Sequence, residues 1–174
     1  MAREFFMQTE RIGFSKWCES DFPFAKTLWG NQKVTKYICA GGKFNLQDIV
    51  NRLNQEIANG ETRDIEYWPI FENATSKFIG CCGLRPYREN EYEMGIHLLP
   101  EFWGHGYAFE AAAAVIQYAF ARLRAQKLFA GHNPNNTASR KLLNKLGFIY
   151  IGDKFYAPTG LYHPSYELEP AGSP

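Results

Sequence analysis

The sequence predicts a single domain of the mixed α/β (α+β) class, in which helices cover the faces of a central sheet. Its 174 residues suffice for one substantial core, and no internal repeat or low-complexity linker divides them. Short segments rich in β-formers follow one another in the middle of the chain, and the second half then alternates strands with amphipathic helices. We expect residues 1–170 to form the domain and residues 171–174 to be a disordered tail.

The N-terminal third predicts one strand and two helices. Alternation of side chains predicts a strand over residues 10–17. Asp21 is a suitable N-cap for a short helix over 22–28, and Asn45 for a longer helix whose apolar residues recur at helical spacing. The pair Asn59-Gly60 is typical of a helix end, so we expect the longer helix to stop there.

The middle of the chain predicts three antiparallel strands in series. The segments are short, rich in β-formers and separated by polar turns, and they cover residues 65–71, 77–84 and 92–98. The turns fall at residues 73–76 and 88–90.

The hydrophobic period changes after residue 105. Apolar residues at helical spacing predict an amphipathic helix from Gly106 to Arg124, followed by a strand over 127–132. A second amphipathic helix is expected over 137–146, ended by Gly147 in a left-handed conformation. Two further strands, over 149–155 and 162–168, complete the sheet.

Composition excludes several classes of partner. The net charge of +1 gives no general attraction for nucleic acid or an acidic membrane, and no apolar run approaches the roughly 20 residues of a bilayer span. The first residues lack the apolar core of a signal peptide, so we expect a cytoplasmic protein. The four cysteines show no C-x-x-C pair or metal-ligand spacing, which favours reduced thiols and no metal.

A glycine-containing turn joins the strand that ends at Leu98 to the long helix. Gly104 and Gly106 allow backbone N–H groups to converge, and the helix adds the positive end of its dipole. Such a junction binds phosphate groups through amides alone, without a basic patch. The alternative is that the glycines only make a tight turn. The sequence is neither a Walker loop nor a complete dinucleotide fingerprint.

A second motif makes a family resemblance specific. The segment E-M-G-I-H-L-L-P-E-F-W-G-H-G-Y-A-F-E-A is followed by a strand, then N-x-x-S-R from Asn136 and K-L-G-F from Lys145. In this order the motifs resemble the GNAT superfamily of acyl-CoA-dependent N-acetyltransferases, in the branch of the ribosomal-protein alanine N-acetyltransferases. The likeness runs from about Thr9 to Leu168.

The resemblance implies a GNAT-like, mostly antiparallel mixed sheet with a splayed strand pair, and acetyl-CoA as acyl donor. The pantetheine arm is expected in the gap between the splayed strands, paired with the backbone near His97 and Leu98. The turn that wraps the pyrophosphate is matched by Trp103, Gly104, His105, Gly106, Tyr107 and Ala108. Trp103 departs from the family's usual Gln or Arg, so the amides rather than this side chain carry the expected role. Asn136, Ser139 and Arg140 are expected near the cofactor, although Asn136 is also a natural N-cap.

Direct transfer to an amine needs a base for the amine proton and an acid for the departing thiolate. Glu93 lies on the strand face that it shares with Glu91, Gly95 and His97, and we take it as the candidate base. A half-exposed strand also carries charges without catalysis; His97 or water are the other candidate bases. The resemblance suggests Ser139 as the acid, with Tyr107 and Tyr156 as alternatives. Cys81 and Cys82 have no histidine at a motif-like spacing, which argues against a cysteine acyl-enzyme.

The expected function is therefore acetylation of a primary amine, on a protein N-terminus or a small molecule. The alternative is a non-catalytic acyl-CoA-binding sensor. Residues 34–44, with their two glycines, and residues 156–163 are expected to set the acceptor, and the sequence leaves the oligomeric state open. Three tyrosines of these segments either line the acceptor site or pack the sheet edge: Tyr37, Tyr156 and Tyr162.

Overall fold

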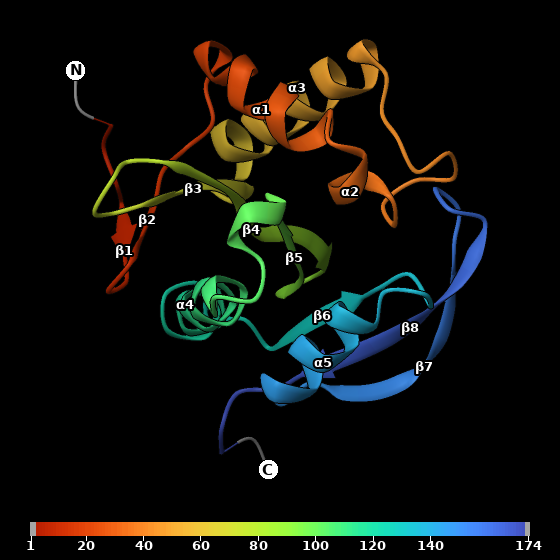
Figure 1. The fold of residues 1–174 in the computed structure, drawn as a ribbon. Helices are drawn as coiled ribbons and strands as arrows, with labels where there is room; N and C mark the ends of the chain where they lie inside the picture. The colour runs from red at the N-terminus through yellow and green to blue at the C-terminus, as the bar shows by residue number, and fades with distance from the viewer. Residues whose placement is uncertain (1–2, 173–174) are drawn as a thin grey trace.

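A computed structural model describes residues 3–172 and contains an eight-stranded sheet of order β1-β2-β3-β4-β5-β6-β8-β7 (Figure 1). All neighbouring strands are antiparallel except β5 and β6, which are parallel. The strands are β1 Met7–Gln8, β2 Ile12–Phe14, β3 Tyr67–Glu72, β4 Phe78–Arg88, β5 Glu91–Leu98, β6 Lys127–Gly131, β7 Ile149–Tyr156 and β8 Leu161–Leu168. The predicted antiparallel series is confirmed as β3, β4 and β5.

Helices cover both faces of the sheet, as predicted (Figure 1). Cys81 and Cys82 show how the two cores are separated, because their side chains enter opposite ones. One core contains side chains of α4 and α5, and the other contains side chains of α1 and α3. The helices are α1 Phe22–Trp29, α2 Gln32–Thr35, α3 Leu46–Arg63, α4 Tyr107–Ala121 and α5 Thr137–Lys145, with 3-10 turns at Glu19–Asp21 and Pro100–Phe102.

The parallel strands β5 and β6 separate after a short paired stretch. Pairing joins Glu91 to Lys127, Tyr92 to Leu128 and Glu93 to Phe129, and goes no further. Strand β5 nevertheless continues to Leu98, still paired with β4 on its other side. The expected splayed strand pair is therefore present, and backbone groups of β5 face the gap instead of a neighbouring strand.

Two predictions about the N-terminal half are wrong in detail. The single strand expected over residues 10–17 is a hairpin of β1 and β2, because the chain turns where the Thr9 N–H donates to the Ile12 carbonyl at 2.8 Å. The longer helix does not stop at Gly60: it continues to Arg63 and ends at Asp64, whose φ is 56°. Gly60 instead makes room for the Glu66 side chain, since a Cβ there would overlap the Glu66 carboxylate.

The C-terminal tail expected to be disordered lies partly outside the described residues, at positions 173–174. Ala171 and Gly172 form a turn. None of the helices within residues 3–172 combines the length and apolarity needed to cross a membrane.

Candidate active site

Two helix N-termini meet the edge of the sheet where β5 and β6 separate. Helix α4 follows β5 through the glycine-containing turn, and α5 follows β6 through residues 132–136. Since β5 and β6 are parallel, their carboxyl ends lie at the same edge, and the two helices begin there. Both positive helix ends therefore border the gap, which suits a ligand that carries phosphate groups.

The turn before α4 depends on two glycines with positive φ. Gly104 has a φ of 77°, and Gly106, the N-cap of α4, has a φ of 82°. Residues with a side chain rarely adopt this conformation. The first N–H groups of α4, from Tyr107 onward, lack partners within the helix and remain free to bind an anion.

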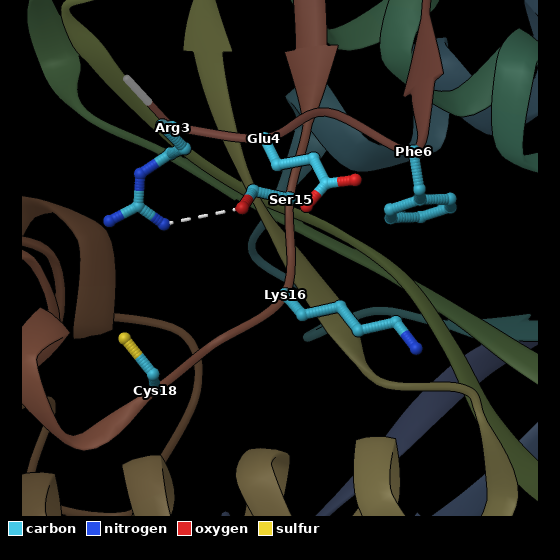
Figure 2. A pocket seen from close by; sticks show the side chains of 6 residues that line it. All are labelled: Arg3, Glu4, Phe6, Ser15, Lys16 and Cys18. Atoms are coloured by element: carbon cyan, nitrogen blue, oxygen red, sulfur yellow. Dashed lines mark hydrogen bonds between the residues drawn. The ribbon is translucent and has the colours of Figure 1, made fainter. Parts of the chain in front are cut away.

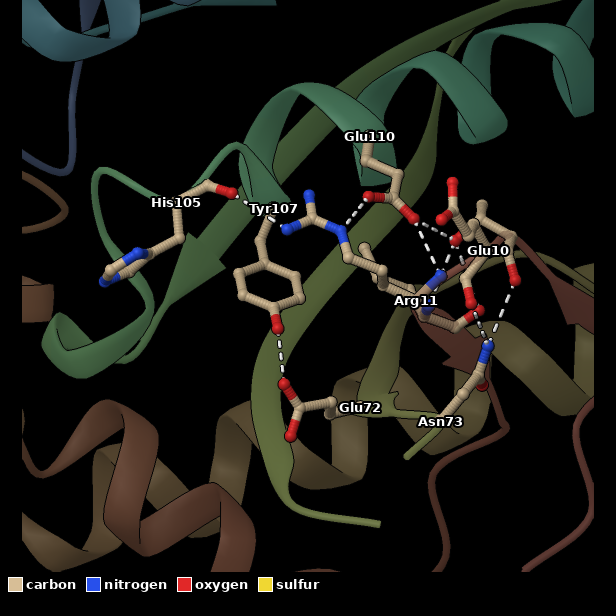
Figure 3. Close-up of polar contacts among 9 residues, drawn as sticks. Glu10, Arg11, Glu72, Asn73, His105, Tyr107 and Glu110 are labelled. Atoms are coloured by element: carbon tan, nitrogen blue, oxygen red, sulfur yellow. Dashed lines mark hydrogen bonds and ion pairs between the residues drawn. The ribbon is translucent and has the colours of Figure 1, made fainter. Parts of the chain in front are cut away.

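An ion pair from the far end of the sheet fixes this turn (Figure 3). Arg11 donates from Nε to Glu110 of α4 at 2.6 Å and from Nη1 to the carbonyl oxygen of His105 at 2.9 Å. The guanidinium also lies over the Tyr107 ring, 4.3 Å from its centroid. Thr9 completes the arrangement by donating to Glu110 at 2.6 Å. The residues thus hold the glycine turn against the start of α4.

Trp103 has a role that its departure from the family pattern did not suggest. Its side chain is 47% exposed, and its indole N–H donates to the carbonyl oxygen of Leu98 at 2.9 Å. This hydrogen bond therefore links the start of the glycine-containing turn to the last residue of β5.

The backbone of β5 presents alternate residues to the gap. Leu99 donates its N–H to the Ile79 carbonyl at 2.9 Å, on the β4 side. In an antiparallel pair the direction of backbone groups alternates, so His97 also bonds towards β4, whereas Ile96 and Leu98 face the gap. Of the two residues expected to pair with pantetheine, Leu98 has its amide on the correct side and His97 does not.

Glu93 lies just where the pairing of β5 and β6 ends. Its side chain is half-buried, and burial raises the pKa of its carboxyl above the ordinary value. Arg85 is its direct cross-strand partner on β4. A carboxyl with a raised pKa at this position is suited to accept a proton near neutral pH.

His97 is engaged with the core beneath α1. Its Nδ1 accepts the indole N–H of Trp29 at 3.2 Å and lies 3.8 Å from Sγ of Cys81. Burial holds the pKa of His97 well below its usual range, so the ring is neutral. These contacts favour a structural role for His97 over that of the base.

The proximity of Cys81 to His97 was not visible from spacing in the sequence, yet it creates no nucleophile. Burial raises the pKa of the Cys81 thiol to about 12, so the thiol stays protonated near neutral pH. A cysteine acyl-enzyme is therefore not supported.

The start of α5 holds the second predicted motif. Asn136 caps the helix by accepting the N–H of Ser139 at 3.1 Å, so its side chain is committed to the cap. Ser139 is half-buried and Arg140 is exposed, both in the first turn of the helix that borders the gap. Ser139 thus stays a candidate acid.

The two alternative acids are placed differently. The hydroxyl of Tyr107 donates to Glu72 of β3, and this bond raises the pKa of the phenol, which argues against an acid role for Tyr107 (Figure 3). Tyr156 lies at the end of β7, near enough to Glu93 for that charge to contribute to its raised pKa, after burial.

The two segments expected to set the acceptor meet each other. Ala40 donates its N–H to the carbonyl oxygen of Pro158 at 2.8 Å, which joins the segment after α2 to the β7–β8 turn. Within that hairpin the ring of Tyr156 packs against the ring of His163, with 4.7 Å between the two ring centroids. Tyr37 is half-buried, whereas Tyr162 is 65% exposed and packs on Phe155.

A charged cluster that the sequence analysis missed lies on the same face as Glu93. It joins α3 to β3 and β4 and consists of Arg52, Glu56, Tyr67 and Arg85. A signal was present, since Glu56 lies three residues after Leu53 on the apolar stripe of its helix and is fully buried. The partner Arg85 comes from a distant strand and could not be assigned from the chain alone.

Two surface hollows lie away from this cluster. One of about 500 Å³ lies beside β1 and β2 and is lined by Arg3, Glu4, Phe6, Ser15, Lys16 and Cys18 (Figure 2). The other, of about 350 Å³, lies beside the Arg11 ion pair. Within residues 3–172, no three His, Cys, Asp or Glu side chains are grouped so as to hold a metal ion.

Comparison with known proteins gives a consistent family. A family model described as an acetyltransferase (GNAT) domain matches residues 11–149. An uncharacterized N-acetyltransferase, p20 of Bacillus licheniformis, is 31% identical over 147 residues, which cover 82% of this chain and 81% of that protein.

Solved structures share the fold. A GNAT-family acetyltransferase from Bacillus anthracis superimposes with a TM-score of 0.80 at 24% identity and covers 94% of this chain and 97% of its own. The ribosomal-protein-S5-alanine acetyltransferase from Vibrio fischeri superimposes with a TM-score of 0.77 at 18% identity. The match covers 95% of this chain and 97% of that chain.

Proposed function

Because the chain belongs to the GNAT acetyltransferase family, whose members use acetyl-CoA as acyl donor, we propose that it acetylates a primary amine directly. The acceptor is the amine of a small molecule or the α-amine of a protein N-terminus. The observation that carries the proposal is the separation of β5 from β6 beside two helix N-termini.

The residues present fit acetyl-CoA. The amides of the Gly104–Ala108 turn would bind the pyrophosphate, helped by the dipole of α4. The backbone N–H and carbonyl of Ile96 and the N–H of Leu98 face the gap and would pair with the amides of the pantetheine arm, whereas the Leu98 carbonyl already accepts the Trp103 indole. Ser139 and Arg140, at the start of α5, border the same gap.

The chemistry then needs three contributions from the chain. A gap-facing N–H of β5 donates to the thioester oxygen and stabilises the negative charge that develops there. Glu93, directly or through water, takes the proton that the amine loses as its nitrogen bonds to the acetyl carbon. Ser139 donates a proton to sulfur as the carbon–sulfur bond breaks, and its own proton is replaced from solvent.

The environment of Glu93 supports its role. An ordinary carboxyl is a weak base at neutral pH, and burial raises the pKa of this one. Glu91, on the same strand face two residues earlier, has its Cα partnered with Lys127 before the strands separate and provides a matched control.

The test is release of CoA thiol from acetyl-CoA with a panel of primary amines. We expect turnover that Glu93→Gln and Ser139→Ala each reduce strongly, while Glu91→Gln leaves it near the wild-type rate. Full activity in both site variants would remove these two roles. Binding of acetyl-CoA without transfer to any amine would favour the acyl-CoA sensor instead.

A further inference from the structure

Two arginines share one fully buried carboxylate beside Glu93. Glu56 accepts from Nε of Arg52 at 3.1 Å, from Arg85 of β4, and from the backbone N–H of Tyr67 at 2.8 Å. The side chain of Glu56 has no exposed surface, and those of Arg52 and Arg85 are 16% and 24% exposed. The arrangement is a partly buried Arg–Glu–Arg group.

The charges of this group do not balance. Two guanidinium groups face the single carboxylate of Glu56, which leaves one positive charge in a largely desolvated position. Glu66 accepts the Trp17 N–H and, since burial raises its pKa to about 8, is mostly protonated at neutral pH. Glu93 forms no direct ion pair with Arg85, its cross-strand partner, but the charges of Arg85 and Arg52 both act on the Glu93 carboxyl and lower its pKa against the larger effect of burial. An ionised Glu93 therefore offsets part of the positive charge without supplying a hydrogen-bond partner, and a further anion in direct contact with the guanidinium groups would be favoured.

Hydrogen-bond donors of the group also lack partners. Nε of Arg85 is buried, and no acceptor within residues 3–172 reaches it. Arg52 uses only Nε towards Glu56, and its two terminal nitrogens, which are not buried, are open to solvent or to a ligand. Buried donors without partners are rare in folded proteins, and a guanidinium fork matches a carboxylate well.

The group lies at the acceptor end of the proposed site. The ring of Tyr67 lies under the Arg85 guanidinium at 4.3 Å and packs so closely on Gly95 that a Cβ there would overlap it. Gly95 is two residues beyond Glu93 on β5, next to the point where pairing with β6 stops. The charges of Arg52 and Arg85 also reach Tyr156 of the β7–β8 hairpin.

We propose that the acceptor is a small amine that also carries a carboxylate, of the amino-acid type, and that Arg52 and Arg85 bind this carboxylate while the amine lies beside Glu93. The inference rests on the proposed amine acetylation. It disfavours polycationic acceptors, since the group's net positive charge would repel them.

Matched substrates test it. CoA release is measured with amino acids and with the amides of the same amino acids, for example leucine against leucinamide, and with spermidine as a polycation. Loss of one charge-assisted contact costs roughly ten- to a hundredfold in kcat/KM. We expect at least one amino acid to exceed its amide by that factor, and spermidine to be poorer than both.

Variants locate the effect. Arg52→Gln is expected to lower kcat/KM for the amino acid and to leave that for its amide nearly unchanged, whereas Arg88→Gln, an exposed arginine on β4, is expected to change neither. If Arg52→Gln folds poorly, Arg52→Lys, which keeps the charge, replaces it. Calorimetry with acetyl-CoA checks that each variant still binds the acyl donor. Equal activity with amino acids and amides, or a preference for spermidine, would overturn the inference.

Binding separates this inference from the proposed function. The melting temperature is measured with CoA present and amino acid or amide added. Stabilisation by the amino acid alone, lost in Arg52→Gln, supports the carboxylate site even if no amine is acetylated. Absence of stabilisation by every amino acid, while an amine without a carboxylate is acetylated or binds, contradicts the carboxylate site and leaves the acetyltransferase intact. If nothing is acetylated and no amino acid stabilises the protein, both proposals are contradicted.

Discussion

Arg11 and Glu110 lie 99 residues apart in the sequence, yet Glu110 accepts both the side-chain and the backbone N–H of Arg11 at the start of α4, at 2.6 and 3.0 Å. The same guanidinium holds the His105 carbonyl of the glycine turn. The first hairpin of the protein, at the β1 edge of the sheet, therefore helps to fix the turn whose amides we propose to bind the pyrophosphate.

This contact predicts an effect on donor binding. Glu110→Gln keeps the shape of the side chain and removes its charge, so the turn loses its anchor while the rest of α4 stays in place. Because the pair is partly exposed, we expect acetyl-CoA to bind roughly three- to tenfold more weakly, by calorimetry. Glu101→Gln, an exposed carboxylate close to the same turn, is the control and should bind as the wild type does. Wild-type affinity in Glu110→Gln would show that the Arg11–Glu110 ion pair does not position the turn.

Glu93 predicts the pH dependence of catalysis. The base must be ionised to act, and burial raises its pKa, so kcat/KM should rise with pH through a midpoint above that of an ordinary carboxyl. Glu93→Gln should lower the rate by roughly 10²- to 10⁴-fold and remove that rising limb. Persistence of the limb in Glu93→Gln would assign it to another group, such as the amine of the acceptor.

Glu66 predicts the pH dependence of stability. Its pKa is raised from 4.5 in the unfolded chain to about 8 by burial, so the folded state holds a proton that the unfolded state releases between these values. Stability from this group is therefore full below about pH 4.5 and falls as pH rises towards 8, by at most about 1.4 kcal/mol per pH unit. Denaturant unfolding of Glu66→Gln should show a flatter pH dependence over this range. Parallel curves for the two proteins would contradict the assignment.

Replacement of Gly60 by alanine is expected to destabilise the protein, although the residue lies within a helix. Alanine normally gains about 1 kcal/mol over glycine in a helix interior. Here its Cβ would overlap the fully buried Glu66, and overpacking costs roughly 1–3 kcal/mol. We expect Gly60→Ala to lower the free energy of unfolding, whereas Gly41→Ala, where the added Cβ meets no atom within 4 Å, should be close to neutral. A stabilised Gly60→Ala would show that the helix end relaxes instead.

Patterns within short stretches of the sequence predicted the strands, helices and turns whose formation depends mainly on neighbouring residues. Short segments rich in β-formers and separated by polar turns identified β3, β4 and β5, and helical spacing identified α3, α4 and α5. The glycine turn was recognised for the same reason, since φ values of 77° and 82° are demanded by the turn itself.

What the sequence missed depends on side-chain packing that exists only in the folded chain. Gly60 was taken for a helix end because its packing against Glu66 is a tertiary contact. Arg52 and Arg85 meet through Glu56, and Arg11 meets Glu110, only after the sheet has formed. The direction of the His97 amide likewise depends on its register with Cys81.

The most direct measurement is a calorimetric titration of acetyl-CoA into the wild type and into Gly106→Leu, with Gly41→Leu as a matched control at an exposed glycine. We predict micromolar binding, about −8 kcal/mol, for the wild type and the control. Gly106→Leu should bind far more weakly, since leucine does not tolerate the φ of 82° that aims the amides of the turn. Absence of binding to the wild type, or undiminished binding to Gly106→Leu, would contradict the assignment of this turn as the acetyl-CoA site.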